Sequence, residues 1–253
     1  KYNLDIAADI ARKTNIITSE ITGINEAARI TCIKPSGTTS LVLGTSSGIH
    51  AWHNDYYLRT MRFGKNEAVA QYLSIYHPEI CEDDILRPHD SLCVRIPVKA
   101  PEGSIMRTET AINTLERVKK FSQEWIKPGH IKGDNSHNVS ATISIDKNKK
   151  YYKSLIDGSY SQDNEEYNTT HDEWRVVGKW MWENREFYNG LSALPYFGGS
   201  YKQAPFEDIS EEEYNRRIRA ITSIDLTKVI ETDDHVEFNQ ISACAGAQCE
   251  LNI

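Results

Sequence analysis

Apolar residues recur three and four positions apart in several stretches of this chain, and this spacing predicts amphipathic helices. The stretches predicted as helices are residues 4–12, 66–76, 108–126, 173–187 and 209–222, the last of which has a thin apolar content. In the fourth stretch the pattern predicts that Trp174, Val177, Trp180 and Met181 point inward. The last stretch opens with Ser210, which is a typical N-cap residue. Glu213 follows three positions later, and this pattern predicts a capping box at the start of the helix.

Short runs rich in β-branched residues lie between these helices and predict strands. The runs are residues 28–33, 91–97, 137–145 and 190–196. Because strands and helices alternate along the chain, the expected fold class is α/β with parallel strand pairing. Cys32, in the first run, is predicted to be a buried thiol. Residues 157–170 are polar throughout and are predicted to form an exposed insertion.

A turn rich in small and hydroxyl residues follows the first predicted strand. Pro35 fixes φ and removes a backbone donor, and Gly37 lets a ligand approach the backbone closely. The hydroxyl groups that follow lie beside the free N–H groups of a predicted helix start, where the helix dipole favours an anion. The candidate phosphate-binding residues are Ser36, Gly37, Thr38, Thr39 and Ser40. The same residues are also typical of a helix N-cap that binds no ligand, so the residues alone leave both interpretations open.

Two cysteines near the end of the chain, Cys244 and Cys249, are separated by four residues, three of which are small. Such a pair can form a disulfide if the intervening loop bends back, and its place near a terminus allows it to move. A zinc site is the alternative, but two thiols without a second pair fall short of four ligands. A pair without a function is the other alternative.

His50 and His53 are three positions apart, which is a metal-ligand spacing on a helix. No cysteine or carboxylate pair nearby completes such a site. A role in packing or hydrogen bonding is therefore predicted for both.

The composition is that of a soluble globular protein, with 39% hydrophobic and 26% charged residues among 253. A formal charge of −7 and the lack of a basic stripe argue against nucleic-acid binding. No apolar run has the roughly 18 residues that a membrane span needs. Five cysteines in a chain of this size do not indicate a disulfide framework, so we expect a reducing, cytoplasmic compartment.

Three ordered motifs resemble those of adenosylcobalamin-dependent (class II) ribonucleotide reductases. The first is the loop at residues 34–40 with the Gly-Thr-Ser-Ser-Gly-Ile-His stretch at 44–50. The second spans residues 188–196 and continues at 203–207, and the third is the cysteine tail at 244–249. In order and content they resemble most closely the C-terminal third of the monomeric ribonucleoside-triphosphate reductases.

The resemblance implies that residues 1–224 form the C-terminal part of a ten-stranded α/β barrel. It implies that residues 225–253 form a mobile redox tail. In such an enzyme Ser36 to Ser40 bind the substrate phosphates, and adenosylcobalamin starts the radical reaction that removes the ribose 2′-OH. Cys244 and Cys249 match a pair that reduces the active-site disulfide and is itself re-reduced by thioredoxin or a similar dithiol.

The Asn-Pro-Cys-Gly-Glu-type loop that carries the family's radical cysteine is absent from this sequence. The chain also begins at Lys1 without a methionine. We therefore expect a piece of a longer protein, or one half of a split enzyme with an N-terminal partner, that is not active by itself. A diphosphate-reducing relative and a non-catalytic nucleotide-binding or thiol-carrier module are the alternatives.

Overall fold

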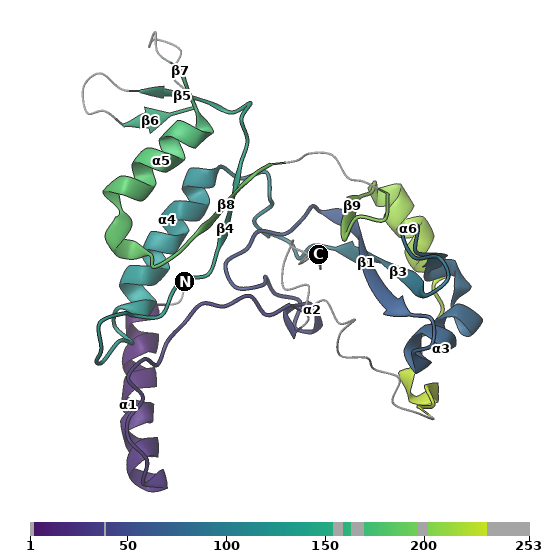
Figure 1. Ribbon diagram of the computed structural model, residues 1–253, viewed down its shortest axis with the longest axis horizontal. Coiled ribbons are helices and arrows are strands. Elements are labelled where there is room, and N and C mark those ends of the chain that lie inside the picture. Colours follow the sequence, from purple (N-terminus) through teal and green to yellow (C-terminus); the bar gives the residue numbers. More distant parts are fainter. Residues whose placement is uncertain (1–2, 38, 154–158, 163–169, 197–201, 232–253) are drawn as a thin grey trace. The chain divides into compact units, whose positions relative to one another are not determined.

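The computed structural model divides into two compact units (Figure 1). Unit 1 comprises residues 1–51 and 108–197, and unit 2 comprises residues 52–107 and 198–253. The structure describes residues 3–37, 39–153, 159–162, 170–196 and 202–231.

Unit 1 combines helices with a parallel strand pair and a small antiparallel sheet. Its helices are α1 (Leu4–Thr22), α2 (Thr39–Val42), α4 (Ala111–Phe121), the π-helical η2 (Ser122–Ile126), α5 (Glu173–Glu183) and η3 (Arg185–Phe187). Its strands are β4 (Thr142–Ile145), β5 (Lys150–Lys153), β6 (Tyr160–Ser161), β7 (Thr170–Asp172) and β8 (Ser192–Pro195). Strands β4 and β8 pair in parallel, whereas β6, β5 and β7 form an antiparallel sheet in that order.

The core of unit 1 lies where α4 and α5 meet β4, as Figure 1 shows. Leu115 and Val118 on α4 are fully buried against Ile143 of β4 and Val177 of α5. Burial of each such side chain contributes about 1.5–3 kcal/mol. This core holds in place the segment that leads into β4, on which the candidate loop is anchored.

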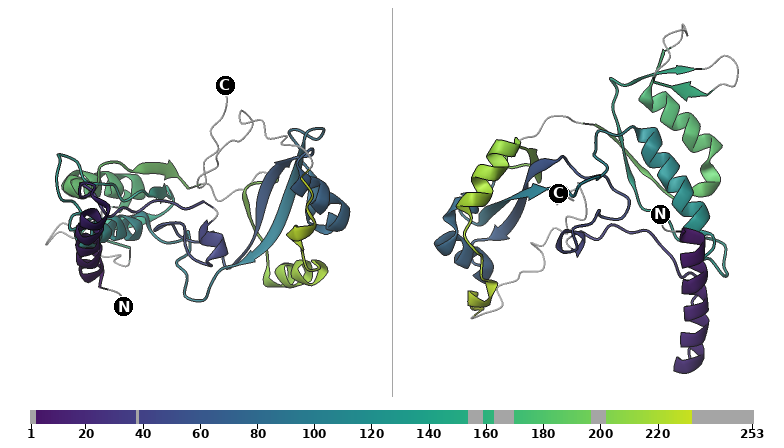
Figure 2. Two further views of the ribbon diagram at one scale, coloured as in Figure 1. Left: turned by 90° about the horizontal axis from the view of Figure 1, so that it is seen from below. Right: turned by 180° about the vertical axis from the view of Figure 1, so that it is seen from behind.

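Unit 2 is built on an antiparallel sheet with the strand order β2-β3-β1-β9. Its strands are β1 (Tyr56–Gly64), β2 (Cys81–Asp83), β3 (Ser91–Lys99) and β9 (Phe206–Asp208). Its helices are α3 (Ala68–Tyr76), η1 (Pro78–Ile80), α6 (Glu211–Ala220) and η4 (Leu226–Lys228). The long strands β1 and β3 run alongside each other in register from Tyr56 opposite Lys99 to Gly64 opposite Ser91 (Figure 2).

The largest core of unit 2 joins α3 to the sheet. Leu73 of α3 packs with Leu92 and Val94 of β3 in this core. Val229 also packs against it, so the described start of the segment predicted as a tail, residues 225–231, lies on unit 2.

Most of the predicted helices are confirmed, with small shifts at their ends. Residues 66–76, 108–126, 173–187 and 209–222 contain α3, α4 with η2, α5 with η3, and α6. The hydroxyl of Ser210 accepts the backbone N–H of Glu213 at 3.2 Å, which confirms the predicted N-cap of α6. The first helix is longer than predicted, because it continues to Thr22 and ends at Gly23 with φ +69°.

The predicted strands at residues 91–97, 137–145 and 190–196 are confirmed as β3, β4 and β8 with shifted ends, but other predictions were wrong. Residues 28–33 form only isolated bridges, Arg29 with His130 and Ile33 with Val139, and Cys32 is exposed instead of buried. Among the described strands only β4 and β8 pair in parallel, because β5, β6, β7 and the strands of unit 2 pair antiparallel. Trp174 is 41% exposed at the start of α5, so it does not point inward with Val177.

Strand β1 was not predicted at all. Tyr57 and Leu58 are adjacent, point to opposite faces of the sheet and are both buried, at 2% and 1% exposure. A strand that is covered on both faces loses the alternation of apolar and polar residues that identifies a half-buried strand. Among the helices that the structure describes, none is long and apolar enough to cross a membrane.

Candidate functional site

The candidate phosphate loop lies in unit 1, between Ile33 and α2. Ile33 forms a parallel bridge with Val139, and its carbonyl accepts the N–H of Ser140 at 3.0 Å. The segment that continues into β4 therefore holds the start of the loop. The carbonyl of Ser36 accepts the N–H of Thr39 at 3.4 Å, and this turn leads into α2.

The predicted loop residues differ in their exposure. Ser36 and Thr39 are exposed, whereas Ser40 is 5% exposed and Thr38 lies outside the described residues. Gly37 has φ +61°, a conformation that L side chains rarely adopt, and a Cβ at this position would meet no atom within 4 Å. The backbone at Gly37 is therefore open to a ligand, with exposed hydroxyl residues on both sides of it.

Ser47 and Gly48, which follow α2 in the chain, bring the far end of the loop back to its start. The hydroxyl of Ser47 accepts the backbone N–H of Ser36 at 3.0 Å. Gly48 has φ +60°, and a Cβ there would lie 3.3 Å from the carbonyl oxygen of Lys34. Sequence reasoning did not assign these roles to Ser47 and Gly48, although both lie within the stretch that carries the resemblance.

His50 and His53 belong to different units, and each has hydrogen-bonding or ring contacts of its own. The His53 ring stacks on Phe206, with centroids 5.2 Å apart, and its Nε2 lies 3.0 Å from Asp208 Oδ1. Burial lowers the pKa of His53 to about 4. The nearby Arg107 guanidinium also lowers this pKa, whereas the Asp208 carboxylate raises it. His53 is therefore neutral at pH 7. No group of three or more His, Cys, Asp or Glu residues in the described part of the chain is arranged to hold a metal ion.

Gln203 is a further residue whose role the sequence did not reveal. It has φ +58°, the one positive φ of a non-glycine residue among those described, and it is 6% exposed. Its side chain accepts the N–H of Ile85 at 2.9 Å and donates to the carbonyl of Asp83 at 2.8 Å. Arg62 donates to its backbone carbonyl at 2.9 Å. These bonds offset a backbone strain of about 1–3 kcal/mol and fix the chain just before β9.

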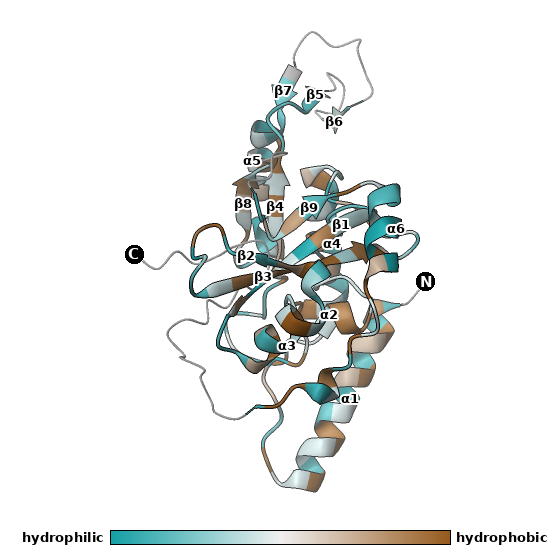
Figure 3. Cartoon of the chain, turned by 90° about the vertical axis from the view of Figure 1, so that its right-hand side faces the viewer, coloured by the Kyte–Doolittle hydropathy of each residue, from teal (hydrophilic) through white to brown (hydrophobic). Residues whose placement is uncertain are grey.

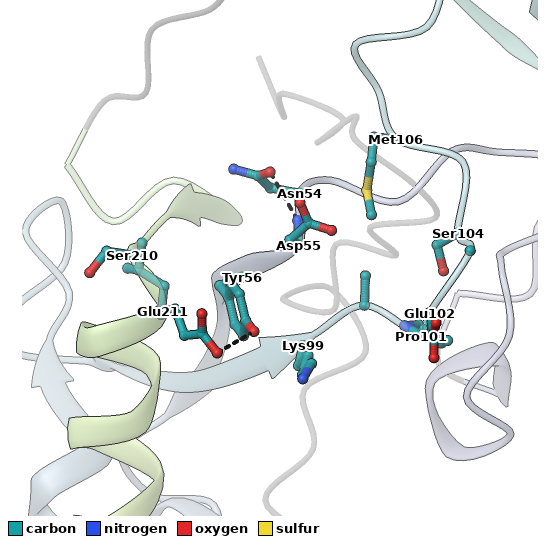
Figure 4. Close-up of a pocket in the computed structure, with 13 residues that line it drawn as sticks. Asn54, Asp55, Tyr56, Lys99, Pro101, Glu102, Ser104, Met106, Ser210 and Glu211 are labelled. Carbon is teal, nitrogen blue, oxygen red and sulfur yellow. Dashed lines mark hydrogen bonds between the residues drawn. The ribbon is translucent and has the colours of Figure 1, made fainter.

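Unit 2 also contains a pocket of about 660 Å³ between the start of β1, the loop after β3 and the start of α6 (Figure 4). The Tyr56 hydroxyl donates to the Glu211 carboxylate at 2.9 Å, and the Lys99 ammonium lies 5.5 Å from the Tyr56 ring centre. Asp55 and Glu102 add two further carboxylates to its lining. Three carboxylates against one lysine repel an anion, so this pocket does not compete with the loop as a phosphate site.

The predicted redox pair, Cys244 and Cys249, lies outside the described residues. The three described cysteines are free thiols. Cys93 is fully buried in β3, and burial raises the pKa of its thiol to about 11, so it is an unreactive thiol. Cys32 is exposed and Cys81 is half-buried.

Comparisons with known proteins agree with the resemblance seen in the motifs. The chain is 27% identical to the adenosylcobalamin-dependent ribonucleoside-triphosphate reductase of Lactobacillus helveticus strain DPC 4571, over 99% of this chain and 29% of that reductase. The reductase of the same description from Euglena gracilis is 28% identical over 97% of this chain and 30% of its own length. The chain thus resembles these reductases over nearly its whole length and spans less than a third of theirs. No protein-family model matches it.

A solved structure gives the same result for the fold. The crystal structure of a B12-dependent (class II) ribonucleotide reductase superimposes with a TM-score of 0.65 at 24% identity. The superposition covers 89% of this chain and 27% of the reductase chain. The mixed α/β fold expected from the sequence is therefore confirmed.

Proposed function

We propose that this chain is the part of an adenosylcobalamin-dependent ribonucleoside-triphosphate reductase that supplies the substrate-phosphate loop and the thiol shuttle. Its similarity to such reductases over 99% of its length carries the proposal. The reaction replaces the ribose 2′-OH by hydrogen. In this proposal the substrate is a ribonucleoside triphosphate, and the electrons come from thioredoxin or a similar dithiol through Cys244 and Cys249.

The phosphate loop is the part of this proposal that the described residues support most directly. The open space above Gly37 admits a phosphate group to the backbone, and the exposed Ser36 and Thr39 place hydroxyl donors beside it. Hydroxyl and backbone N–H donors orient a phosphate without changing the protonation state of the protein. Because the loop is anchored on the segment before β4, it holds a substrate in a fixed position.

The pocket of unit 2 does not fit adenosylcobalamin. A corrin macrocycle with its amide side chains and nucleotide tail needs a large site, and the pocket of unit 2 measures about 660 Å³ and is lined by Asp55, Glu102 and Glu211. We therefore assign no residue of this chain to the cofactor. In the proposal the cofactor binds to the rest of the longer protein.

An exposed apolar stripe on α1 supports a place within a larger barrel. Ile6, Ile10, Ile17 and Ile21 fall on one side of the helix and are 56–79% exposed, whereas Ala8 on another side is buried. Figure 3 shows hydrophobic segments recurring along α1. Contiguous exposed apolar residues mark interaction surfaces, and in the proposal the remaining strands and helices of a ten-stranded barrel cover this stripe.

The proposed function predicts turnover by the longer protein that contains this chain. We expect that protein to convert ATP to dATP when adenosylcobalamin and a dithiol are present, and not when the cofactor is omitted. ADP, tested in parallel, is expected to be the poorer substrate. Cofactor-dependent turnover of ADP alone would indicate the diphosphate-reducing relative. If neither nucleotide is turned over, the remaining interpretation is a non-catalytic nucleotide-binding or thiol-carrier module.

Replacing Gly37 with alanine tests the loop itself. The methyl group occupies the space through which a phosphate approaches the backbone, so we expect KM for ATP to rise about tenfold, the equivalent of about 1.4 kcal/mol. Gly23→Ala is the matched control, because Gly23 also has a positive φ and open space around its Cβ position but lies at the end of α1. Both variants carry similar backbone strain. Equal KM values for the two variants would contradict a phosphate site at Gly37.

A further inference from the structure

The hydroxyl of Ser47 closes the proposed phosphate loop. It accepts the backbone N–H of Ser36 at 3.0 Å, across eleven positions of sequence. This N–H belongs to the first predicted phosphate-binding residue, so its direction is set by Ser47. Gly48 follows in the chain and approaches Lys34 closely, which brings the two ends of the loop together.

The imidazole of His50 then links Ser47 to the parallel strand pair. The carbonyl of Ser47 accepts two bonds from His50, one from its backbone N–H at 3.1 Å and one from ring Nδ1 at 2.9 Å. The other ring nitrogen, Nε2, lies 3.2 Å from the backbone N–H of Thr142. A backbone N–H can only donate, so Nε2 accepts and the ring proton is on Nδ1. Both ring nitrogens are therefore used to connect the loop to the first residue of β4.

Both ends of the loop are thus tied to one short segment. Ile33, before the loop, bonds to Ser140, and His50, after it, bonds to Thr142. This segment runs directly into β4, which packs in the core of unit 1 and pairs with β8. Anchoring both ends of a loop on a packed strand reduces the conformations open to it, and this lowers the entropy lost on binding.

We propose that Ser47 and His50 are positioning residues for the substrate phosphates. They do not touch the substrate; Ser47 holds the backbone of Ser36 and Gly37 in the conformation that receives a phosphate, and His50 holds Ser47. The N–H of Ser36 is occupied by Ser47, so the hydroxyl of Ser36 is the group of this residue that meets the phosphate. This inference rests on the proposed function of the loop.

Removing the Ser47 hydroxyl is the direct test, made in the longer protein with ATP as the substrate. We expect Ser47→Ala to raise KM for ATP about five- to tenfold, which corresponds to one lost hydrogen bond, and to change kcat less than about twofold. Ser47→Thr keeps a hydroxyl acceptor and is expected to restore KM. A residue that only stabilises the fold would lower the unfolding temperature instead and would leave KM unchanged.

A double-mutant cycle tests the link between the two residues. His50→Ala is expected to raise KM as Ser47→Ala does, and the double variant is expected to raise it by clearly less than the product of the two single effects. Independent roles would give the full product. The matched control is Thr45→Val, because Thr45 is an exposed hydroxyl residue of the same loop and its variant is expected to keep the normal KM.

The outcomes separate this inference from the function on which it rests. If ATP is turned over and Gly37→Ala raises KM but Ser47→Ala does not, the loop function stands and the positioning role is wrong. If the protein binds ATP without reducing it, the dissociation constant of ATP replaces KM in the same comparison. If it neither binds nor reduces ATP, both proposals are wrong.

Discussion

Replacing Cys244 or Cys249 with serine is expected to abolish ribonucleotide reduction when thioredoxin is the reductant. A thiol–disulfide relay needs both sulfur atoms, because one thiolate attacks the active-site disulfide and the second resolves the mixed disulfide that forms. The tail cysteines end as a disulfide and the active site regains two thiols, so two electrons have moved from the tail to the active site. Serine can neither attack the active-site disulfide nor resolve the mixed disulfide, so a single replacement of either cysteine stops the cycle.

The measurement compares two reductants in the longer protein. Dithiothreitol reaches a buried disulfide directly, so both variants are expected to retain turnover with dithiothreitol and to lose it with thioredoxin. Cys32→Ser is the control, because Cys32 is an exposed free thiol without a part in the proposed relay. Equal loss of activity with both reductants would rule out a shuttle and would indicate damage to the fold or the active site.

Replacing Glu173 with glutamine is expected to lower the free energy of unfolding by about 2–4 kcal/mol. Glu173 is 0% exposed at the first position of α5. Its Oε1 accepts the N–H of Ala111 at 3.0 Å and the hydroxyl of Tyr151 at 2.8 Å, and its Oε2 accepts the N–H of Asp146 at 2.7 Å. Burial and the Glu173 carboxylate raise the pKa of Tyr151, so its hydroxyl stays protonated and remains a donor.

Three donors converge on this carboxylate, and an amide has only one oxygen with which to accept them. Glutamine therefore places an N–H₂ group against at least one buried donor, and that donor loses its partner. The carboxylate also lies at the N-terminal ends of α4 and α5, where a negative charge is favourable.

Tyr151→Phe provides the comparison for this experiment. It removes one of the three donors and leaves the carboxylate with two, so the expected loss is only about 1 kcal/mol. Urea unfolding followed by tryptophan fluorescence measures both variants, since Trp180 of α5 lies in the core of unit 1. A loss from Glu173→Gln no larger than that from Tyr151→Phe would show that water replaces the missing acceptor.

The sequence determined the local features of this protein. The spacing of apolar residues was sufficient for the centres of α3, α4 and α5, because each of these helices buries one stripe against a core. Ser210 and Glu213 were sufficient for the start of α6, because a capping hydrogen bond spans only three residues. The order of the motifs was also sufficient for the resemblance that the comparisons confirmed.

Tertiary structure decided the features that depend on distant partners. Strand β1 is covered on both faces, and the antiparallel pairing of β1 with β3 follows from contacts that no local pattern contains. The bond from the N–H of Thr142 to His50 spans 92 positions, and the bond from the N–H of Ala111 to Glu173 spans 62. A histidine or a glutamate has the same local sequence signal whether its partner is water or a buried N–H. Only the folded chain brings those donors within 3.2 Å and gives the two side chains their roles.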